Sequence, residues 1–119
     1  MLPPIILSIA GSDCSGGAGI QADIKTISAL GGYAASVITA VTAQNTLGVQ
    51  SVYPIPADMV KAQITSVMDD LRPDAVKIGM VHDAGIVTTI VDCLQTYTPE
   101  CIVYDPVMIC LLYTSDAAD

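Results

Sequence analysis

The sequence contains no phenylalanine and no tryptophan, and its only aromatic residues apart from one histidine are 5 tyrosines. The hydrophobic 52% of its 119 residues therefore comes mostly from isoleucine, valine, leucine and alanine. Aliphatic side chains of this kind are typical of parallel strands that helices cover on both faces. This composition favours the α/β class and is ample for the core of one small domain.

Basic residues are also scarce, because lysine and arginine number 4 against 12 aspartates and glutamates, giving a formal net charge of −8. A surface that follows a phosphate backbone needs many cations, so nucleic acid is a poor candidate for a partner. Residues 1–11, MLPPIILSIAG, have no basic segment, and their apolar run is too short for a signal peptide or a membrane span. We therefore expect a cytoplasmic protein with no membrane partner.

Cysteine and histidine are too few and too scattered for a zinc site or a disulfide framework. Cys14, Cys93, Cys101 and Cys110 form no C-x-x-C pair, and His82 is the only histidine. Free, buried thiols are the default expectation for these cysteines. A lone histidine before a helix is typical of a solvated cap.

Strand-like and helix-like segments alternate along the chain. Short apolar runs that stop at glycine or proline predict strands, and apolar residues at helical spacing predict helices. The predicted strands are residues 5–11, 34–45, 49–55, 75–80 and 101–108, and the predicted helices are residues 19–30, 56–71 and 83–97. This order predicts a mostly parallel central sheet flanked by helices, joined by right-handed crossovers. Ligands bind such sheets at the carboxyl ends of the strands.

The last ten residues, CLLYTSDAAD at 110–119, do not continue this pattern. They resemble, residue for residue, what one reading frame of a widely used transposon-based sequencing adapter encodes. We therefore predict that residues 1–109 belong to the native domain and that residues 110–119 are adapter read-through. A native but unusual tail is the alternative.

A glycine-rich loop, GSDCSGGAGIQAD at residues 11–23, joins the first strand to the first helix. No lysine follows it as in a G-x-x-x-x-G-K-[ST] loop, and its glycines miss the G-x-G-x-x-G spacing. What remains is a loop of small residues with backbone N–H groups at a helix N-terminus, where a polar ligand can approach closely. Taken alone, it indicates a tight turn or a binding site equally well.

Two polar side chains near the strand ends point to a ligand. A helical advance of about 100° per residue places Asp23 inside an apolar stripe, between Ile27 and Leu30. A carboxylate there is costly unless it meets donors, although contact with the helix N-terminus would also explain it. Gln44 closes a strand, and its amide offers a donor and an acceptor to the edge of a heterocyclic base. A turn is the alternative, and it suits Asn45 better than Gln44.

Two further charged residues have open roles. Lys77 lies within an apolar strand, where a lysine more often snorkels or pairs than takes part in catalysis. Asp105 precedes Pro106 after a buried strand, which suits a helix cap, a turn, or part of a metal and phosphate site. Spacing alone does not choose among these.

Three blocks of sequence, residues 10–46, 76–80 and 105–108, form a specific pattern: AGSDCSGGAGIQADIKTISALGGYAASVITAVTAQNT, VKIGM and DPVM. They resemble the N-terminal part of the hydroxymethylpyrimidine and phosphomethylpyrimidine kinases of thiamine biosynthesis, in the ribokinase-like superfamily. The resemblance runs from about residue 5 to residue 108, in order and without large gaps. It implies a ribokinase-like α/β fold and ATP-dependent phosphorylation of an aminopyrimidine alcohol and then of its monophosphate, with Mg²⁺.

The resemblance also implies roles for individual residues. The implied substrate-binding residues are Gly11, Ala18, Asp23, Gln44, Met80 and Val107. Among these, Asp23 and Gln44 would recognise the pyrimidine, while the others would lie against it. Asp105 would lie toward the phosphates and the magnesium ion. No catalytic residue carries over, because the family's downstream Asn-x-x-Glu and Gly-Thr-Gly-Cys segments have no counterpart in this sequence.

Two other functions stay open at this point. One is a related kinase that acts on pyridoxal, and the other is a pyrimidine-binding module without catalytic activity. The GAGIQAD and TAQNT blocks favour the pyrimidine kinase. Cys14 stands where similar proteins commonly carry proline or serine, and we expect little consequence. Similar proteins are commonly homodimers, so a homodimer is implied by analogy alone.

Overall fold

The computed structural model describes residues 2–81, 83–104 and 107–110, with the backbone alone for the last segment. The strands are β1 (Ile5–Asp13), β2 (Tyr33–Asn45), β3 (Gly48–Pro54), β4 (Ala75–Ile78), β5 (Cys101–Tyr104) and β6 (Val107–Cys110). The helices are α1 (Gly19–Ala29), α2 (Ala57–Asp70) and α3 (Ala84–Tyr97). Strands and helices therefore alternate as the sequence predicts.

Among the described residues the strands form one sheet with the order β3-β2-β1-β4-β5-β6. The four central strands are parallel, while β3 and β6 pair antiparallel at the two edges. The expected α/β fold with a mostly parallel sheet is confirmed. The segment 101–108 was expected to hold one strand and its exit, but it contains β5 and the start of β6.

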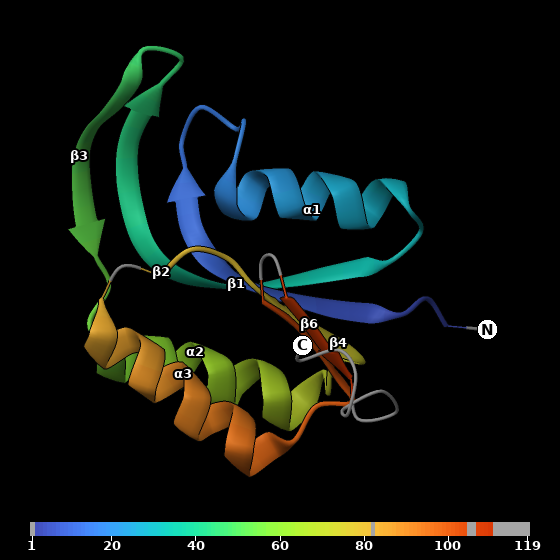
Figure 1. The fold of residues 1–119 in the computed structure, drawn as a ribbon. Coiled ribbons are helices and arrows are strands. Elements are labelled where there is room, and N and C mark those ends of the chain that lie inside the picture. Colours follow the sequence, from blue (N-terminus) through green and yellow to red (C-terminus); the bar gives the residue numbers. More distant parts are fainter. Residues whose placement is uncertain (1, 82, 105–106, 111–119) are drawn as a thin grey trace.

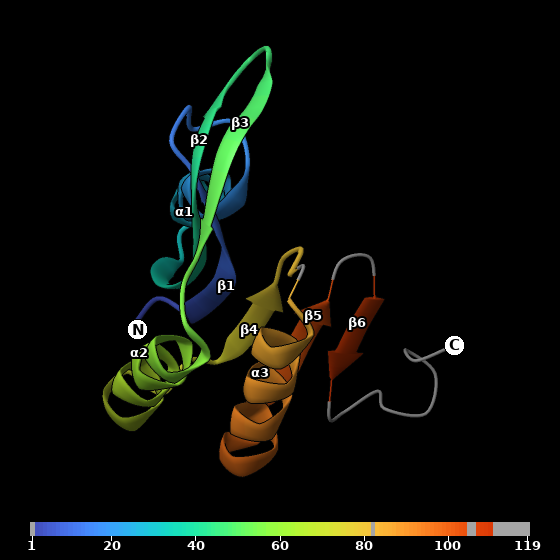
Figure 2. The same ribbon diagram turned by 90° about the vertical axis from the view of Figure 1, so that its left-hand side faces the viewer.

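The helices lie on opposite faces of the sheet, with α1 on one side and α2 and α3 together on the other (Figures 1 and 2). The chain leaves β1 through α1 to reach β2, and it later reaches β4 on the other side of β1 through α2. The direction of strand addition thus reverses beside β1. In open α/β sheets, the carboxyl ends of the strands at such a reversal form the crevice where ligands bind.

The main core lies between the sheet and the helices α2 and α3. Its fully buried aliphatic residues are Leu7, Ile9, Val37, Val60, Ile64, Val76 and Ile90. On the opposite face α1 packs over β1 and β2, with Ile20 buried and Ile27 partly buried. Ile24, which follows Ile20 at helical spacing, is nevertheless 37% exposed, because α1 covers only two strands.

The hairpin of β2 and β3 projects beyond the helices as a curved arm (Figures 1 and 2). Every residue of β3 is exposed. Its apolar side chains Val49, Val52 and Tyr53 face solvent in this chain. The arm forms the β3 side of the strand-end crevice, and the rest of its surface faces solvent.

The cysteines meet the expectation of free, buried thiols only in part. Cys93 is free and buried, Cys14 is free but exposed, and Cys101 is disulfide-bonded. No helix of the described residues is long and apolar enough to cross a membrane.

Candidate functional site

The glycine-rich loop is organised by the buried carboxylate of Asp13 at the end of β1. One oxygen of Asp13 accepts hydrogen bonds from the N–H and the hydroxyl of Ser15, at 2.9 and 2.7 Å. The other accepts from the N–H groups of Gly17 and Ala18, at 3.0 and 2.8 Å. The Ser15 hydroxyl, helped by these N–H groups and opposed by burial, holds the pKa of Asp13 below its ordinary value. The loop therefore encloses the negatively charged carboxylate of Asp13.

This arrangement changes what the loop offers to a ligand. The N–H groups of Ser15, Gly17 and Ala18, which the sequence suggests as donors, already donate to Asp13. These three donors are therefore not free to bind an anion, and the loop forms a preformed wall. Sequence reasoning missed the role of Asp13, although an aspartate followed two residues later by serine is a common signal for an Asx turn.

A close approach of two backbones explains one of the glycines. Gly19, the first residue of α1, has φ +61°, and a Cβ there would collide with the carbonyl oxygen of Gly11. Gln21 adds a second tie, since its side chain accepts from the N–H of Asp13 at 2.8 Å and donates to the Ser12 hydroxyl at 2.7 Å. The first turn of α1 is therefore locked onto the end of β1.

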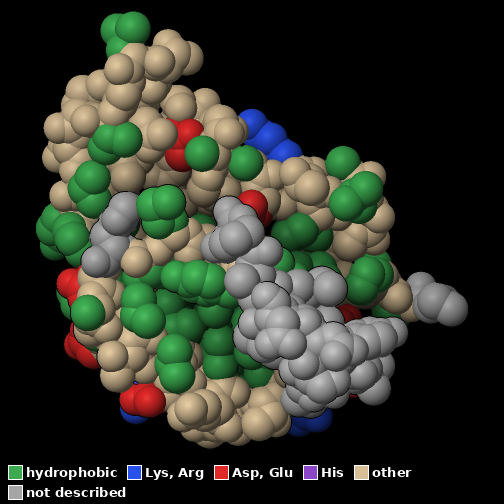
Figure 3. Space-filling view, in the orientation of Figure 1, with side chains coloured by type: hydrophobic (Ala, Val, Ile, Leu, Met, Phe, Trp, Pro, Cys, Tyr) green, Lys and Arg blue, Asp and Glu red, His purple; other side chains and the backbone are tan. Residues whose placement is uncertain are grey.

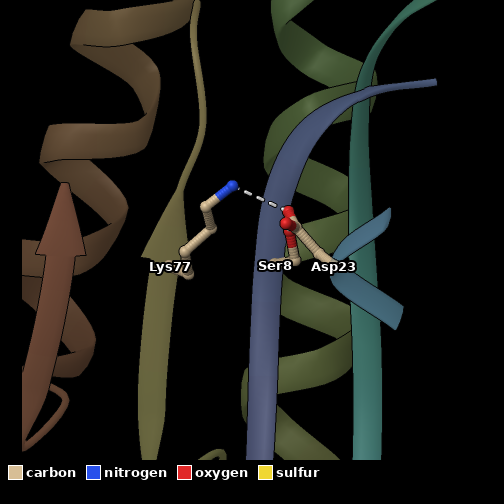
Figure 4. Close-up of polar contacts among 3 residues, drawn as sticks. All are labelled: Ser8, Asp23 and Lys77. Carbon is tan, nitrogen blue, oxygen red and sulfur yellow. Dashed lines mark hydrogen bonds and ion pairs between the residues drawn. The ribbon is translucent and has the colours of Figure 1, made fainter. Parts of the chain in front are cut away.

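Asp23 of α1 lies over β1 and meets the donors that its inward position requires (Figure 4). Its Oδ2 accepts from the Ser8 hydroxyl at 2.6 Å and from Lys77 Nζ at 2.8 Å. The side chains of Lys77 and Asp23 are 30% and 19% exposed. Lys77 is thus paired, which is one of the two ordinary outcomes expected from its sequence context.

Gln44 lies at the end of β2, where two neighbours fix it against the loop. The Thr42 hydroxyl contacts the Ser12 carbonyl oxygen at 2.6 Å and Gln44 Oε1 at 3.1 Å. The Cys14 thiol donates to the Gln44 carbonyl oxygen at 3.1 Å and accepts from its N–H at 3.2 Å. Both the backbone and the amide of Gln44 are therefore held in place beside the strand-end crevice.

Two adjoining cavities occupy this crevice at the carboxyl ends of β1, β2 and β4. The polar cavity, of about 340 Å³, is lined by residues that include Gly11, Asp13, Ala18, Gln44, Lys77 and Met80. The apolar cavity, of about 210 Å³, lies on the β3 side and is lined by residues that include Ala40, Val52, Val81 and Ile86. Gly11, Thr42, Gln44 and Met80 line both cavities. Figure 3 shows hydrophobic side chains gathered between α1 and α3 on this side of the molecule.

The structure brings together four of the six predicted substrate-binding residues: Gly11, Ala18, Gln44 and Met80 line the polar cavity. Asp23 lies behind that wall, in contact with Lys77, which does line the cavity. The side chain of Val107 and the whole of Asp105 lie outside the described residues. Lys77 also lines the polar cavity, although its position within an apolar strand predicts no binding role.

A larger cavity, of about 470 Å³, lies at the opposite end of the sheet. It is lined by residues at the ends of α2 and α3, including Arg72, Asp74 and Tyr97. The Tyr97 hydroxyl donates to Asp69 at 2.8 Å, and this bond raises the pKa of Tyr97. No predicted site residue lies there, and volume alone does not outweigh the position of the polar cavity beside the glycine-rich loop.

Comparison with known proteins shows which family this chain is similar to. The family model described as phosphomethylpyrimidine kinase matches residues 13–115. The hydroxymethylpyrimidine/phosphomethylpyrimidine kinase of Escherichia coli is 57% identical over 103 residues, which cover 87% of this chain and 39% of that protein. The chain thus spans about two fifths of the length of this relative.

Solved structures give the same result. The crystal structure of phosphomethylpyrimidine kinase from Clostridium difficile superposes with a TM-score of 0.85 at 54% identity, covering 92% of this chain and 47% of that one. The pyridoxal kinase of Staphylococcus aureus, in complex with AMP-PCP and pyridoxal, gives 0.80 at 33% identity, covering 92% and 41%. The family match over most of the residues that build the crevice shows that this chain belongs to the phosphomethylpyrimidine kinase family.

Proposed function

We propose that this chain forms the substrate-binding part of a kinase that phosphorylates 4-amino-5-hydroxymethyl-2-methylpyrimidine and then its monophosphate, using ATP, in thiamine biosynthesis. The observation that carries the proposal is the polar cavity beside the β1 reversal, lined by residues of the glycine-rich loop and by Gln44. The family match and the E. coli relative support the same substrates. A cytoplasmic location and a homodimer, both expected from the sequence, remain parts of the proposal.

In this proposal Gln44 reads the polar edge of the pyrimidine. Its amide is held by Thr42, and its backbone is held by Cys14, so little freedom is lost when a ring binds. Gly11 and Ala18 have little or no side chain, so a ring can approach the backbone at these positions. Met80 is 76% exposed, and its flexible side chain supplies an apolar cover for the ring. Small and apolar walls with few polar groups are typical of sites for small ligands.

Asp23 has two oxygens that serve different partners in the proposal. Oδ2 holds Ser8 and Lys77. Oδ1 is the proposed acceptor for a ring amino group, and this contact requires the ring to reach past Lys77, because Asp23 does not itself line the polar cavity. The carboxylate would then join the ring to the sheet through a charge-assisted hydrogen bond.

ATP and magnesium are also part of the proposal. The S. aureus relative is described as a complex with AMP-PCP, which supports a nucleotide as the phosphate donor. When bound, magnesium would neutralise charge on the phosphates. Among the described residues no cluster of three His, Cys, Asp or Glu side chains could hold a metal ion. Asp105 remains the proposed residue on that side.

A kinase assay on a full-length protein tests the proposed function. Residues 1–109 are joined to the C-terminal part of the E. coli kinase to give what we term the completed kinase. The expected result is phosphate transfer from ATP to the pyrimidine alcohol and to its monophosphate, with the unmodified E. coli kinase as the positive control. If that control is active and the completed kinase, folded as judged by its thermal unfolding, transfers to neither, the proposal is wrong.

Pyridoxal phosphorylation is the second candidate, because the S. aureus pyridoxal kinase shares the fold of this part at 33% identity. The E. coli relative, at 57% identity, favours the pyrimidine. The same assay with pyridoxal as acceptor separates the two, since a pyridoxal kinase would give the higher kcat/KM with that alcohol. A protein that binds the pyrimidine without phosphorylating it would instead be the non-catalytic module.

A further inference from the structure

Cations are scarce near the proposed substrate site. The chain has four in all, and three of them do not line the polar cavity: Lys25 donates to the Gly16 carbonyl oxygen of the glycine-rich loop in an exposed contact, while Lys61 and Arg72 line other cavities. Among the described residues Lys77 is the one lysine or arginine that lines the polar cavity. Within this chain, whose net charge is −8, Lys77 is therefore the cation that the described residues offer to an anionic ligand in that cavity.

Lys77 is held beside the cavity by the sheet and by one carboxylate. It pairs in register with Ser8 of β1, and both side chains lie on the α1 face of the sheet (Figure 4). Its Nζ lies 2.8 Å from Asp23 Oδ2. An ammonium group has three N–H donors, and this contact uses one of them. Because the side chain is 30% exposed, the other donors can reach a ligand in the cavity.

Gly79 leaves room next to this ammonium group. It follows β4 and lines the polar cavity, and a Cβ there would lie 3.5 Å from Lys77 Nζ and 2.9 Å from the Cβ of Ala10. A side chain at this position would narrow the approach to Nζ. The other ionisable residue of the cavity, Asp13, is occupied by its own loop donors and does not compete for Lys77.

We propose that Lys77 determines whether the site accepts the monophosphate in addition to the alcohol. With the neutral alcohol bound, Lys77 remains paired with Asp23, which offsets its charge. With the monophosphate bound, the remaining donors of Lys77 bind the phosphate oxygens. Asp23 acts as a positioning residue for the ammonium group. This inference rests on the proposed function, in which one site receives both substrates.

The charge difference between the two substrates is the physical reason. A phosphate monoester carries a charge of about −1.5 to −2 at neutral pH, whereas the alcohol is neutral. The first substrate therefore needs no cation from this part of the site, and the second gains charge-assisted hydrogen bonds from one. A lysine that is already paired with a carboxylate suits both substrates. Asp23 balances its charge when the neutral alcohol is bound, and its remaining donors bind the phosphate when the monophosphate is bound.

The experiment measures kcat/KM of the completed kinase for the alcohol and for the monophosphate. Lys77→Met keeps the length of the side chain and removes its charge. We expect kcat/KM for the monophosphate to fall by about tenfold or more relative to that for the alcohol, mainly through KM. Lys61→Met, the same change on the exposed face of α2, is the matched control and should leave the ratio unchanged.

Lys77→Met also leaves Asp23 without its cation, which could destabilise the protein. The double variant Lys77→Met with Asp23→Asn removes that unpaired charge, and its ratio should shift in the same direction. Lys77→Arg, which keeps the charge, should retain phosphorylation of the monophosphate. An unchanged ratio in both the single and the double variant would overturn the inference while leaving the proposed function intact. A completed kinase that phosphorylates neither substrate would remove both.

Discussion

At the scale of single residues, Gln44 is the side chain whose proposed role can be tested most directly. Gln44→Leu keeps roughly the volume but leaves polar atoms of the ring unpaired, at a cost of about 1–3 kcal/mol. We expect kcat/KM of the completed kinase for the alcohol to fall by about tenfold or more. KM for ATP should change little. Gln95→Leu on the exposed face of α3 is the control, and equal losses in both variants would argue against a ring contact.

Asp23 gives a second test, because it holds Lys77 in the structure and is proposed to contact the ring. Asp23→Asn keeps the shape and removes the charge, so a charge-assisted bond of about 1.5–3 kcal/mol to the ring would be lost. We expect kcat/KM to fall by about tenfold or more for both substrates, since both carry the same ring. If thermal unfolding shifts and the kinetics do not, Asp23 serves the packing of α1 on β1 and does not contact the ring.

Asp13 makes stability depend on pH in a direction that follows from its lowered pKa. A carboxyl group whose pKa in the folded protein lies below its ordinary value of 3.8 stabilises the fold fully above that value. The stabilisation is lost as the pH falls through the lowered pKa of the folded state. In the completed kinase, the difference in denaturation midpoint between the unmodified protein and Asp13→Asn should be largest near neutral pH and shrink below the ordinary value. A difference that is constant with pH would mean that Asp13 contributes no charge effect.

At the scale of the elements, the approach of α1 to the end of β1 sets the geometry of the site. Gly19→Ala would place a non-glycine residue at φ +61° and a methyl group against the Gly11 carbonyl oxygen. We expect the completed kinase to lose about 1–3 kcal/mol of stability from the backbone strain, and more from the collision. Denaturant unfolding measures this loss. Gly31→Ala is a matched control, because Gly31 has φ +89° and open space around it. Equal losses in the two variants would show that the close approach adds nothing.

Much of this arrangement follows from local signals in the sequence, and part of it does not. Periodicity and glycine positions predict the helices, the parallel strands and the crevice beside the loop. Asp23 and Lys77 are 54 positions apart in the sequence. Their pairing cannot be predicted from local pattern, because it depends on β1 and β4 lying side by side in the sheet. The exposure of Ile24 likewise depends on how many strands α1 covers. Local pattern therefore predicts elements, whereas strand order determines which polar side chains meet.

At the scale of the whole molecule, this chain exposes surfaces that a complete sheet would be expected to cover. Helix α1 packs on β1 and β2, while Ala75, Lys77 and Val103 on the same face of β4 and β5 are partly exposed. The β2–β3 arm presents Val49 and Tyr53 to solvent. Strand β3 is also an edge of the sheet. Exposed apolar patches and unpaired strand edges promote association.

We therefore predict that the 119-residue chain by itself is neither an active kinase nor a stable monomer. Phosphoryl transfer depends on groups that position and stabilise the moving phosphate. The chain spans only 39% of the length of its E. coli relative, so most of that kinase has no counterpart here. In a kinase assay, the purified chain should show no ATP-dependent phosphorylation above a no-protein control. In an unfolding experiment, the same chain should aggregate or unfold without a cooperative transition. A monomer by sedimentation that unfolds cooperatively would show that the six described strands and three described helices suffice for stability. Turnover above the control would show that the transfer groups lie within these residues.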